Sequence, residues 1–115
     1  MQELAYAGPL PLEVTVALAG RLPDAVEVAA YYVVAESVAN AVKHAQASVV
    51  SVGIARRDGV LRVTVADDGG GGADPRGGSG LRGLADRVEA LNGALTIRSA
   101  AHDGTLIEAV LPCGS

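Results

Sequence analysis

Four polar side chains are spaced so that a helix would place them in one stripe. Glu36, Asn40, Lys43 and His44 follow one another at intervals of four, three and one residues, among alanine, valine and tyrosine. These intervals match one face of a helix. Carboxylate and amide oxygens are hard ligands suited to Mg²⁺, and an ammonium group can neutralise phosphate. The stripe therefore indicates a metal and phosphate site, although an ordinary solvated helix face stays open as an alternative.

A carboxylate ends an apolar segment that has the pattern of a strand. Asp67 closes this segment, and glycines occupy positions 69 to 72. A fixed carboxylate can accept a hydrogen bond from an exocyclic amine such as that of adenine. Glycines beside it let the backbone approach a flat ligand closely. Strand alternation places Asp67 on the buried side and Asp68 on the other side. An ordinary acidic turn is the alternative for this sequence.

Glycines dominate the segment that comes next. Eight of the fifteen glycines lie between positions 69 and 83. Because glycine leaves the backbone free, we expect a loop over residues 70–79 that is mobile without a ligand. The run from Gly78 to Gly83 then opens a second helix, whose first N–H groups favour anions. This segment therefore predicts a flexible lid followed by a phosphate contact.

The run from Gly78 to Gly83 also matches the pattern G-x-G-x-x-G of dinucleotide-binding proteins. That fold requires a strand immediately before the motif. Residues 74–78 contain a proline and two glycines, which do not form a central strand, so the sequence argues against a dinucleotide-binding fold. A phosphate loop ending in lysine is excluded, because no glycine directly precedes Lys43, the only lysine. A hydrolase nucleophile elbow fails, because Leu81 stands where that motif needs its second glycine.

The elements that must position these groups can be read from periodicity and turn signals. A capping-box pattern at Asp24 and Glu27 begins the first helix. Asp58-Gly59 and Asp103-Gly104 join consecutive strands, and Asn92-Gly93 ends the second helix. We expect helices over residues 24–45 and 81–91, and strands over residues 11–18, 48–56, 60–66, 94–99 and 105–111. The result is an α+β two-layer sandwich, with a mixed, mostly antiparallel sheet of about five strands and helices on one face.

Composition narrows the function classes. The 115 residues fit one domain, 1–115, and the net charge is −4 with eight scattered arginines, so we expect no nucleic-acid partner. Cys113 is the only cysteine, and the two histidines His44 and His102 lie far apart, which excludes an ordinary zinc site. The single cysteine suits a reducing compartment. No apolar stretch reaches about 18 residues, so we expect no direct membrane contact by this domain.

Taken together, the order and spacing of the motifs resemble the N box and glycine boxes of the GHKL ATPases. The motifs are the stripe from Glu36 to His44, then Asp67-x-Gly69-x-Gly71, Gly78-x-Gly80-Leu81 and Gly104-Thr105. This superfamily includes gyrase, a group of heat-shock chaperones, mismatch-repair ATPases and sensor histidine kinases, and its domain has the Bergerat ATP-binding fold. The runs over residues 34–45 and 80–88, together with the short loop between the glycine boxes, resemble kinases paired with NarL/LuxR-type response regulators.

The resemblance assigns roles to individual residues. It implies that Asn40 coordinates Mg²⁺ and that Glu36 fills the acidic, catalytic position of the N box. Asp67 would accept a hydrogen bond from the adenine amine, and Thr105 would support this contact through its hydroxyl group or a water. The other implied ATP contacts come from the phosphate side and from close backbone approach: Lys43, His44, Gly69, Gly71, Gly78, Gly80 and Leu81. Two departures from the family pattern, Gly72 and Ser79, imply a looser lid and weaker nucleotide binding.

The implied function is that of the ATP-binding catalytic domain of a sensor histidine kinase. Such a domain binds Mg-ATP and gives the γ-phosphoryl group to a histidine on a separate dimerisation domain, which in turn serves a response regulator. Neither His44 nor His102 stands in the context of a phosphoacceptor, so we expect the chain to be a cytoplasmic domain of a longer protein, with a membrane anchor in the parent protein left open. An anti-sigma-factor-type serine kinase and a nucleotide-binding module without transfer activity remain alternatives.

Overall fold

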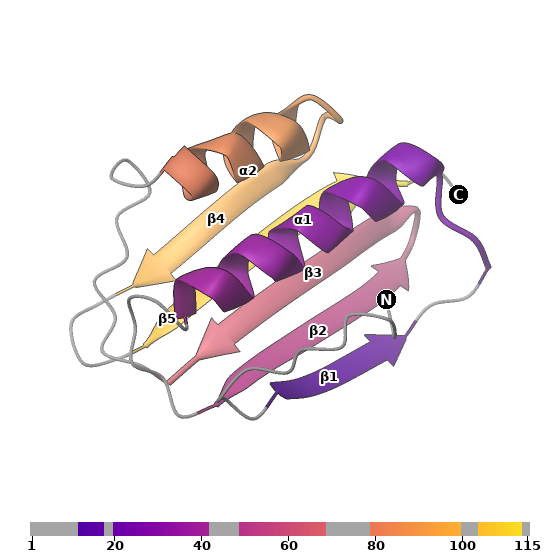
Figure 1. Ribbon diagram of the computed structural model, residues 1–115. Coiled ribbons are helices and arrows are strands. Elements are labelled where there is room, and N and C mark those ends of the chain that lie inside the picture. Colours follow the sequence, from indigo (N-terminus) through magenta and orange to yellow (C-terminus); the bar gives the residue numbers. More distant parts are fainter. Residues whose placement is uncertain (1–11, 18–19, 42–48, 69–78, 100–103, 114–115) are drawn as a thin grey trace.

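The computed structural model describes residues 12–17, 20–41, 49–68, 79–99 and 104–113. They form one five-stranded sheet with two helices packed on the same face (Figure 1). Along the chain the elements are β1 (Leu12–Ala17), α1 (Asp24–Asn40), β2 (Val50–Arg57), β3 (Val60–Asp67), α2 (Ser79–Glu89), β4 (Ala94–Ser99) and β5 (Thr105–Pro112). The prediction of a two-layer α+β sandwich is confirmed.

The sheet has the strand order β1-β2-β3-β5-β4. Strands β1 and β2 are parallel, and the three other neighbouring pairs are antiparallel. This mixture follows from the connections, because β1 reaches β2 through helix α1, whereas β2–β3 and β4–β5 follow each other directly. The predicted mixed, mostly antiparallel sheet is therefore correct.

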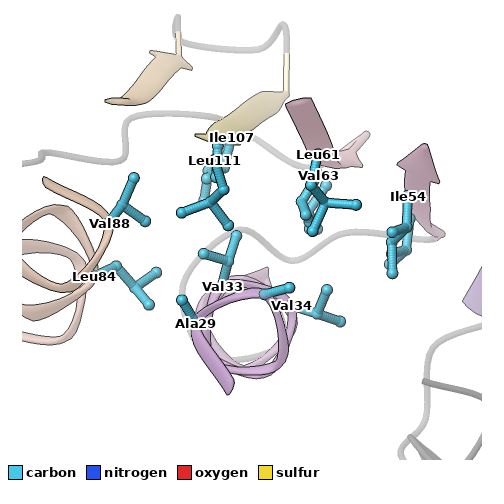
Figure 2. Close-up of a cluster of buried hydrophobic side chains, with 14 of the residues drawn as sticks. Ala29, Val33, Val34, Ile54, Leu61, Val63, Leu84, Val88, Ile107 and Leu111 are labelled. Atoms are coloured by element: carbon cyan, nitrogen blue, oxygen red, sulfur yellow. The ribbon is translucent and has the colours of Figure 1, made fainter. Parts of the chain in front are cut away.

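The core lies between the sheet and the two helices. Figure 2 shows Val33 and Val34 of α1 facing Leu61 and Val63 of the sheet. All four side chains are fully buried. The buried hydrophobic residues are Val, Leu, Ile and Ala, with Cys113 at the end of the chain, as expected for a chain without Phe or Trp. Burial of this aliphatic face fixes α1 along β3 and β5.

Two turns at one end of the sheet follow the predicted chemistry. Asp58 and Gly59 have φ values of 54° and 76°, as a two-residue turn between antiparallel strands requires. Asn92 has a φ of 64°. The N–H groups of Asn92 and Gly93 donate to the carbonyl groups of Glu89 (2.9 Å) and Val88 (3.0 Å). This pair of hydrogen bonds is a Schellman motif, which ends helix α2.

The predicted start of the first helix at Asp24 is confirmed, but its predicted N-cap is wrong by one residue. Pro23 occupies the N-cap position with φ −56° and ψ 143°, and no side chain caps the helix. Asp24 is therefore the first helical residue, where its charge and that of Glu27 favour the helix dipole. Proline takes the N-cap because its ring already fixes φ near the required value. Ala41, directly after α1, still has helical angles (φ −62°, ψ −40°), and the rest of the predicted extension to Ala45 falls on residues outside those described.

The second helix begins and ends two residues earlier than predicted, at Ser79 and Glu89. Residues 90–92 form the turn that the sequence assigned to the helix. Neither of the two described helices combines the length and apolar content that crossing a bilayer requires.

Candidate functional site

The strand register brings several predicted site residues to one end of the sandwich. Asp67 is the last residue of β3 and pairs with Val50 at the start of β2 and with Thr105 at the start of β5. Ser99, the last residue of β4, also pairs with Thr105. Figure 1 shows that α1 ends and α2 begins at this same end of the sheet. We call it the site end, and the end that carries the Asp58-Gly59 turn the far end.

The two consecutive aspartates differ in environment, as predicted. Asp67 is half-buried and Asp68 is exposed. A side-chain oxygen of Asp68 accepts a hydrogen bond of 3.0 Å from the backbone N–H of Val49. Asp68 therefore ties the end of β3 to the residue before β2. Asp67 continues the inward phase of Leu61 and Val65 on the same strand.

A glycine that precedes β5 supports the backbone of Asp67. Gly104 is buried and has a φ of +79°. A Cβ atom at this position would collide with the carbonyl oxygen of Asp67 and approach the Cα atom of Asp68 to 3.4 Å. Only glycine allows this close passage of the two segments. The sequence indicated a turn at Asp103-Gly104 but did not predict this contact, because it depends on the pairing of β3 with β5.

Helix α1 brings the described part of the predicted polar stripe, Glu36 and Asn40, to the site end. Asn40, its last residue, is half-buried, and Glu36, one turn earlier, is exposed. One turn earlier still, the ring of Tyr32 lies under the guanidinium group of Arg87 from α2, with 4.1 Å from the guanidinium carbon to the ring centroid. The stripe thus runs along the side of α1 that faces α2.

The remaining predicted contacts divide into two groups. Ser79, Gly80 and Leu81 form the first turn of α2, so its first backbone N–H groups lie at the site end, as a phosphate contact requires. The predicted lid over residues 70–79 is described only at Ser79, which is helical. The other residues lie outside the part of the chain that the structure describes and stay predictions: Lys43, His44, Gly69, Gly71, Gly72, Gly78 and the rest of the lid, residues 70–78.

Two polar side chains are buried among the described residues, and both come from elements that meet at the site end. Thr105 is 5% exposed and Ser37 is 1% exposed. Asp67 and Thr105 both have interaction partners. The Ser37 hydroxyl group instead has no hydrogen-bond partner in the described part of the molecule. Sequence reasoning did not single out Ser37, although helical spacing from Val33 and Val34 places it on the buried face.

These groups can recognise a flat, polar ligand with a charged tail. The carboxylate of Asp67 accepts hydrogen bonds, and hydroxyl groups both donate and accept. The described residues hold no group of three or more His, Cys, Asp or Glu side chains that could bind a metal by themselves. Asn40 offers one amide oxygen, which fits Mg²⁺ because this ion takes few protein ligands and binds mainly to phosphate and water.

Residues 25–115 match the family described as histidine kinase-, DNA gyrase B- and HSP90-like ATPases. The chain belongs to this ATPase family. The predicted membership of the GHKL superfamily is thereby confirmed. Membership of this family implies that the domain binds ATP.

Curated relatives narrow the likeness to one branch of the ATPase family. The chain is 40% identical over 88 residues to the sensor histidine kinase YdfH of Bacillus subtilis, with 71% of this chain and 22% of that protein covered. It is 36% identical to the oxygen sensor histidine kinase NreB of Staphylococcus carnosus, with 82% of this chain and 28% of that protein covered. The chain thus spans about a quarter of the length of the curated relatives it matches.

Solved structures agree with this branch. The histidine kinase domain of the blue-light-activated histidine kinase from Erythrobacter litoralis EL346 superposes with a TM-score of 0.78 at 27% identity, covering 92% of this chain and 52% of that one. The mycobacterial sensor histidine kinase MprB, at 24% identity, shares the fold with a TM-score of 0.68 and covers 91% and 83% of the two chains. The predicted likeness to histidine kinases is confirmed.

Proposed function

We propose that the chain is the ATP-binding catalytic domain of a sensor histidine kinase, which binds Mg-ATP and gives its γ-phosphoryl group to a histidine on another domain. The observation that carries the proposal is the meeting of Asn40, Asp67 and Thr105 at one end of a sandwich of this ATPase family. The relatives named above are sensor histidine kinases, which favours this function over a serine kinase of the anti-sigma-factor type.

The base of ATP would be recognised at the end of β3. Asp67 accepts a hydrogen bond from the exocyclic amine of adenine, and Thr105, directly across on β5, supports this contact through its hydroxyl group or a water. Glycines 69 and 71 allow the base to approach the backbone. Gly104 fits this role because it lets the two strand ends lie close together.

The phosphates would lie between the end of α1 and the start of α2. The amide oxygen of Asn40 would coordinate Mg²⁺, and Lys43 and His44 would contact the phosphates. The N–H groups near Gly78, Gly80 and Leu81 would donate to phosphate oxygens. The bound magnesium ion would neutralise charge on the phosphates. Glu36 is exposed one turn from Asn40, where it is able to face an incoming acceptor histidine and receive its proton.

The partners follow from the same proposal. The acceptor histidine belongs to another domain of the parent protein, and that domain passes the phosphoryl group to a response regulator. We place the domain, residues 1–115, in the cytoplasm, where ATP is available. No nucleic acid and no membrane contact by this domain are part of the proposal.

Calorimetry tests the binding half of this function. The domain is titrated with ATP, ADP and GTP, each with and without Mg²⁺. We expect Mg²⁺ to strengthen the binding of ATP, and we expect ATP to bind better than GTP, because the carboxylate of Asp67 accepts from an amine and repels a carbonyl oxygen. Equal affinity for ATP and GTP, or no binding of either, contradicts the proposal.

Phosphoryl transfer is tested with the parent protein's acceptor domain added in trans. Labelled ATP should mark that domain at histidine, giving an acid-labile and base-stable phosphate. Glu36→Gln should slow the transfer at least tenfold while ATP affinity stays within twofold of the original. Ser51→Ala, a change on the opposite face of the sheet, is the control. Labelling at serine would support the serine-kinase alternative instead.

A further inference from the structure

Ser37 is the one buried side chain among the described residues whose polar atom has no hydrogen-bond partner. It is 1% exposed, so bulk water does not reach it. A buried hydroxyl group without a partner lowers the stability of the fold, and native proteins contain few of them. Alanine would fill the same helical position without this cost and with a higher helix propensity. A hydrogen bond from the Ser37 hydroxyl group to a bound ligand would remove this cost.

The position of Ser37 indicates where that partner lies. Ser37 follows Val33 and Val34 by four and three residues, so it shares the face of α1 that packs on the sheet. Figure 2 shows Val33 and Val34 on this face, opposite Leu61 and Val63. Ser37 lies one turn nearer to the end of α1, and the corresponding step along β3 leads from Val63 towards Asp67.

Buried polarity among the described residues is confined to this end of the sandwich. The only other buried polar side chain there is Thr105, which pairs with Asp67 across β3 and β5. Apolar side chains make up the rest of the buried core. The wall that α1, β3 and β5 form at the site end thus carries two hydroxyl groups and one carboxylate.

We propose that the Ser37 hydroxyl group is a specificity-determining contact for adenine, made directly or through one ordered water to the ring nitrogen beside the exocyclic amine. This inference rests on the proposed function and names a residue that the family resemblance did not assign. Asp67 accepts from the amine, and the hydroxyl group or its water donates to the neighbouring nitrogen. An acceptor beside a donor matches the edge of adenine, whereas guanine presents the opposite order.

The test measures nucleotide affinity of the whole chain and of two variants by calorimetry. Ser37→Ala removes the hydroxyl group. Ser51→Ala removes a hydroxyl group from the opposite face of the sheet, where it donates to Glu13 at 3.3 Å. The ligands are ATP and 1-deaza-ATP, in which carbon replaces the ring nitrogen beside the amine. Thermal unfolding without nucleotide is followed in parallel.

We expect Ser37→Ala to weaken ATP about fivefold to thirtyfold, as loss of one buried hydrogen bond implies. The same variant should change the affinity for 1-deaza-ATP less than twofold, because the group that the hydroxyl addresses is already missing. Its melting temperature without nucleotide should not fall, since an unpaired hydroxyl group is removed. Ser51→Ala should leave both affinities unchanged.

Three results would overturn the inference. The first is an unchanged affinity of Ser37→Ala for ATP, and the second is an equal loss for ATP and 1-deaza-ATP. The third is a lowered melting temperature of Ser37→Ala together with an unchanged ratio of its affinities for ATP and 1-deaza-ATP, which would make Ser37 a structural residue. Each of these results leaves the proposed function standing as long as the original chain binds Mg-ATP. Failure of the original chain to bind ATP would instead refute the proposed function itself.

Discussion

The two ends of the sandwich use similar residues for different purposes. At the far end, the left-handed residues Gly59 and Asn92 close a hairpin and end a helix. At the site end, the left-handed residue Gly104 lies against the backbone of Asp67. The described part of the site end also carries both buried polar side chains of the core, Ser37 and Thr105. Left-handed residues thus complete the fold at the far end, whereas at the site end Gly104 supports a residue that is proposed to bind ATP.

Two glycines make this contrast testable. Gly93 lies at the far end, and a Cβ atom there would collide with the carbonyl oxygen of Val110. Gly104 lies at the site end with an equally close approach to Asp67. Both positions constrain stability through backbone contact, but only the second touches a residue proposed to bind ATP.

The largest effect is expected from Gly104→Ala. The side chain collides with Asp67, and the φ of +79° is strained for alanine, so stability should fall by about 2–5 kcal/mol. The folded fraction should also bind ATP at least tenfold more weakly, because Asp67 must move. Denaturant unfolding and calorimetry measure the two quantities.

Gly93→Ala is the matched variant, expected to lower stability by about 1–3 kcal/mol through overpacking, with ATP affinity of the folded protein within twofold. Gly83→Ala, on α2 with open space around it, should leave stability unchanged or raise it by about 0.5–1 kcal/mol. If Gly93→Ala weakens ATP as much as Gly104→Ala does, the two ends do not differ as described.

The next effect separates Asp67 from Asp68. Asp67→Asn replaces an acceptor with a group that presents a donor to the amine of adenine, and ATP affinity should fall tenfold to a hundredfold, about 1–3 kcal/mol. Asp68→Asn keeps an oxygen that can accept from the N–H group of Val49, so affinity should stay within twofold. Calorimetry measures both affinities, and equal losses of ATP affinity in the two variants would contradict the proposed role of Asp67.

Local patterns were enough to predict most of the fold. Alternation along residues 60–66 identified a strand, and the structure extends it by one residue, to Asp67. The Asp58-Gly59 turn was predicted because its two residues tolerate positive φ. The N-cap of α1 differs from the prediction because two local signals compete there, and the fixed φ of Pro23 outweighs the capping tendency of Asp24.

The site was less predictable, because it depends on pairing between distant segments. Motif spacing indicated Asn40 and Asp67, and the structure places them on elements that end side by side (Figure 1). The support that Gly104 gives to Asp67 depends on the register of β3 with β5, which the sequence alone does not fix. The unpaired hydroxyl group of Ser37 emerges only once its neighbours are known.

A smaller effect is expected from Asn40→Ala, which tests the phosphate side of the site end. Magnesium ions should strengthen ATP binding to the original chain, and this strengthening should be lost in the variant, a change of about tenfold. Metal-free binding and AMP affinity should stay within twofold. Lys43→Ala should weaken ATP more than AMP. If AMP and ATP suffer alike in both variants, the polar stripe of α1 is a solvated face and not a phosphate site.

The smallest effect concerns the contact between Tyr32 of α1 and Arg87 of α2, which lies between the site end and the far end of the sandwich. Arg87 stacks on Tyr32 at 4.1 Å, but Tyr32 is 40% exposed, so the coupling energy should be only about 0.5–1 kcal/mol. Tyr32→Leu, Arg87→Met and the double variant, compared by denaturant unfolding, measure it as a double-mutant cycle.

Buried Leu84 and Val88 pack α2 into the core, so the position of this helix should not depend on the Tyr32–Arg87 contact. ATP affinity should therefore change less than twofold in all three variants. The same contact lies on the side of α1 that carries Glu36 and Asn40. A tenfold loss of ATP affinity in these variants would mean that the contact sets the position of the first turn of α2 relative to the phosphates. The middle of the helix pair would then contribute to ATP binding.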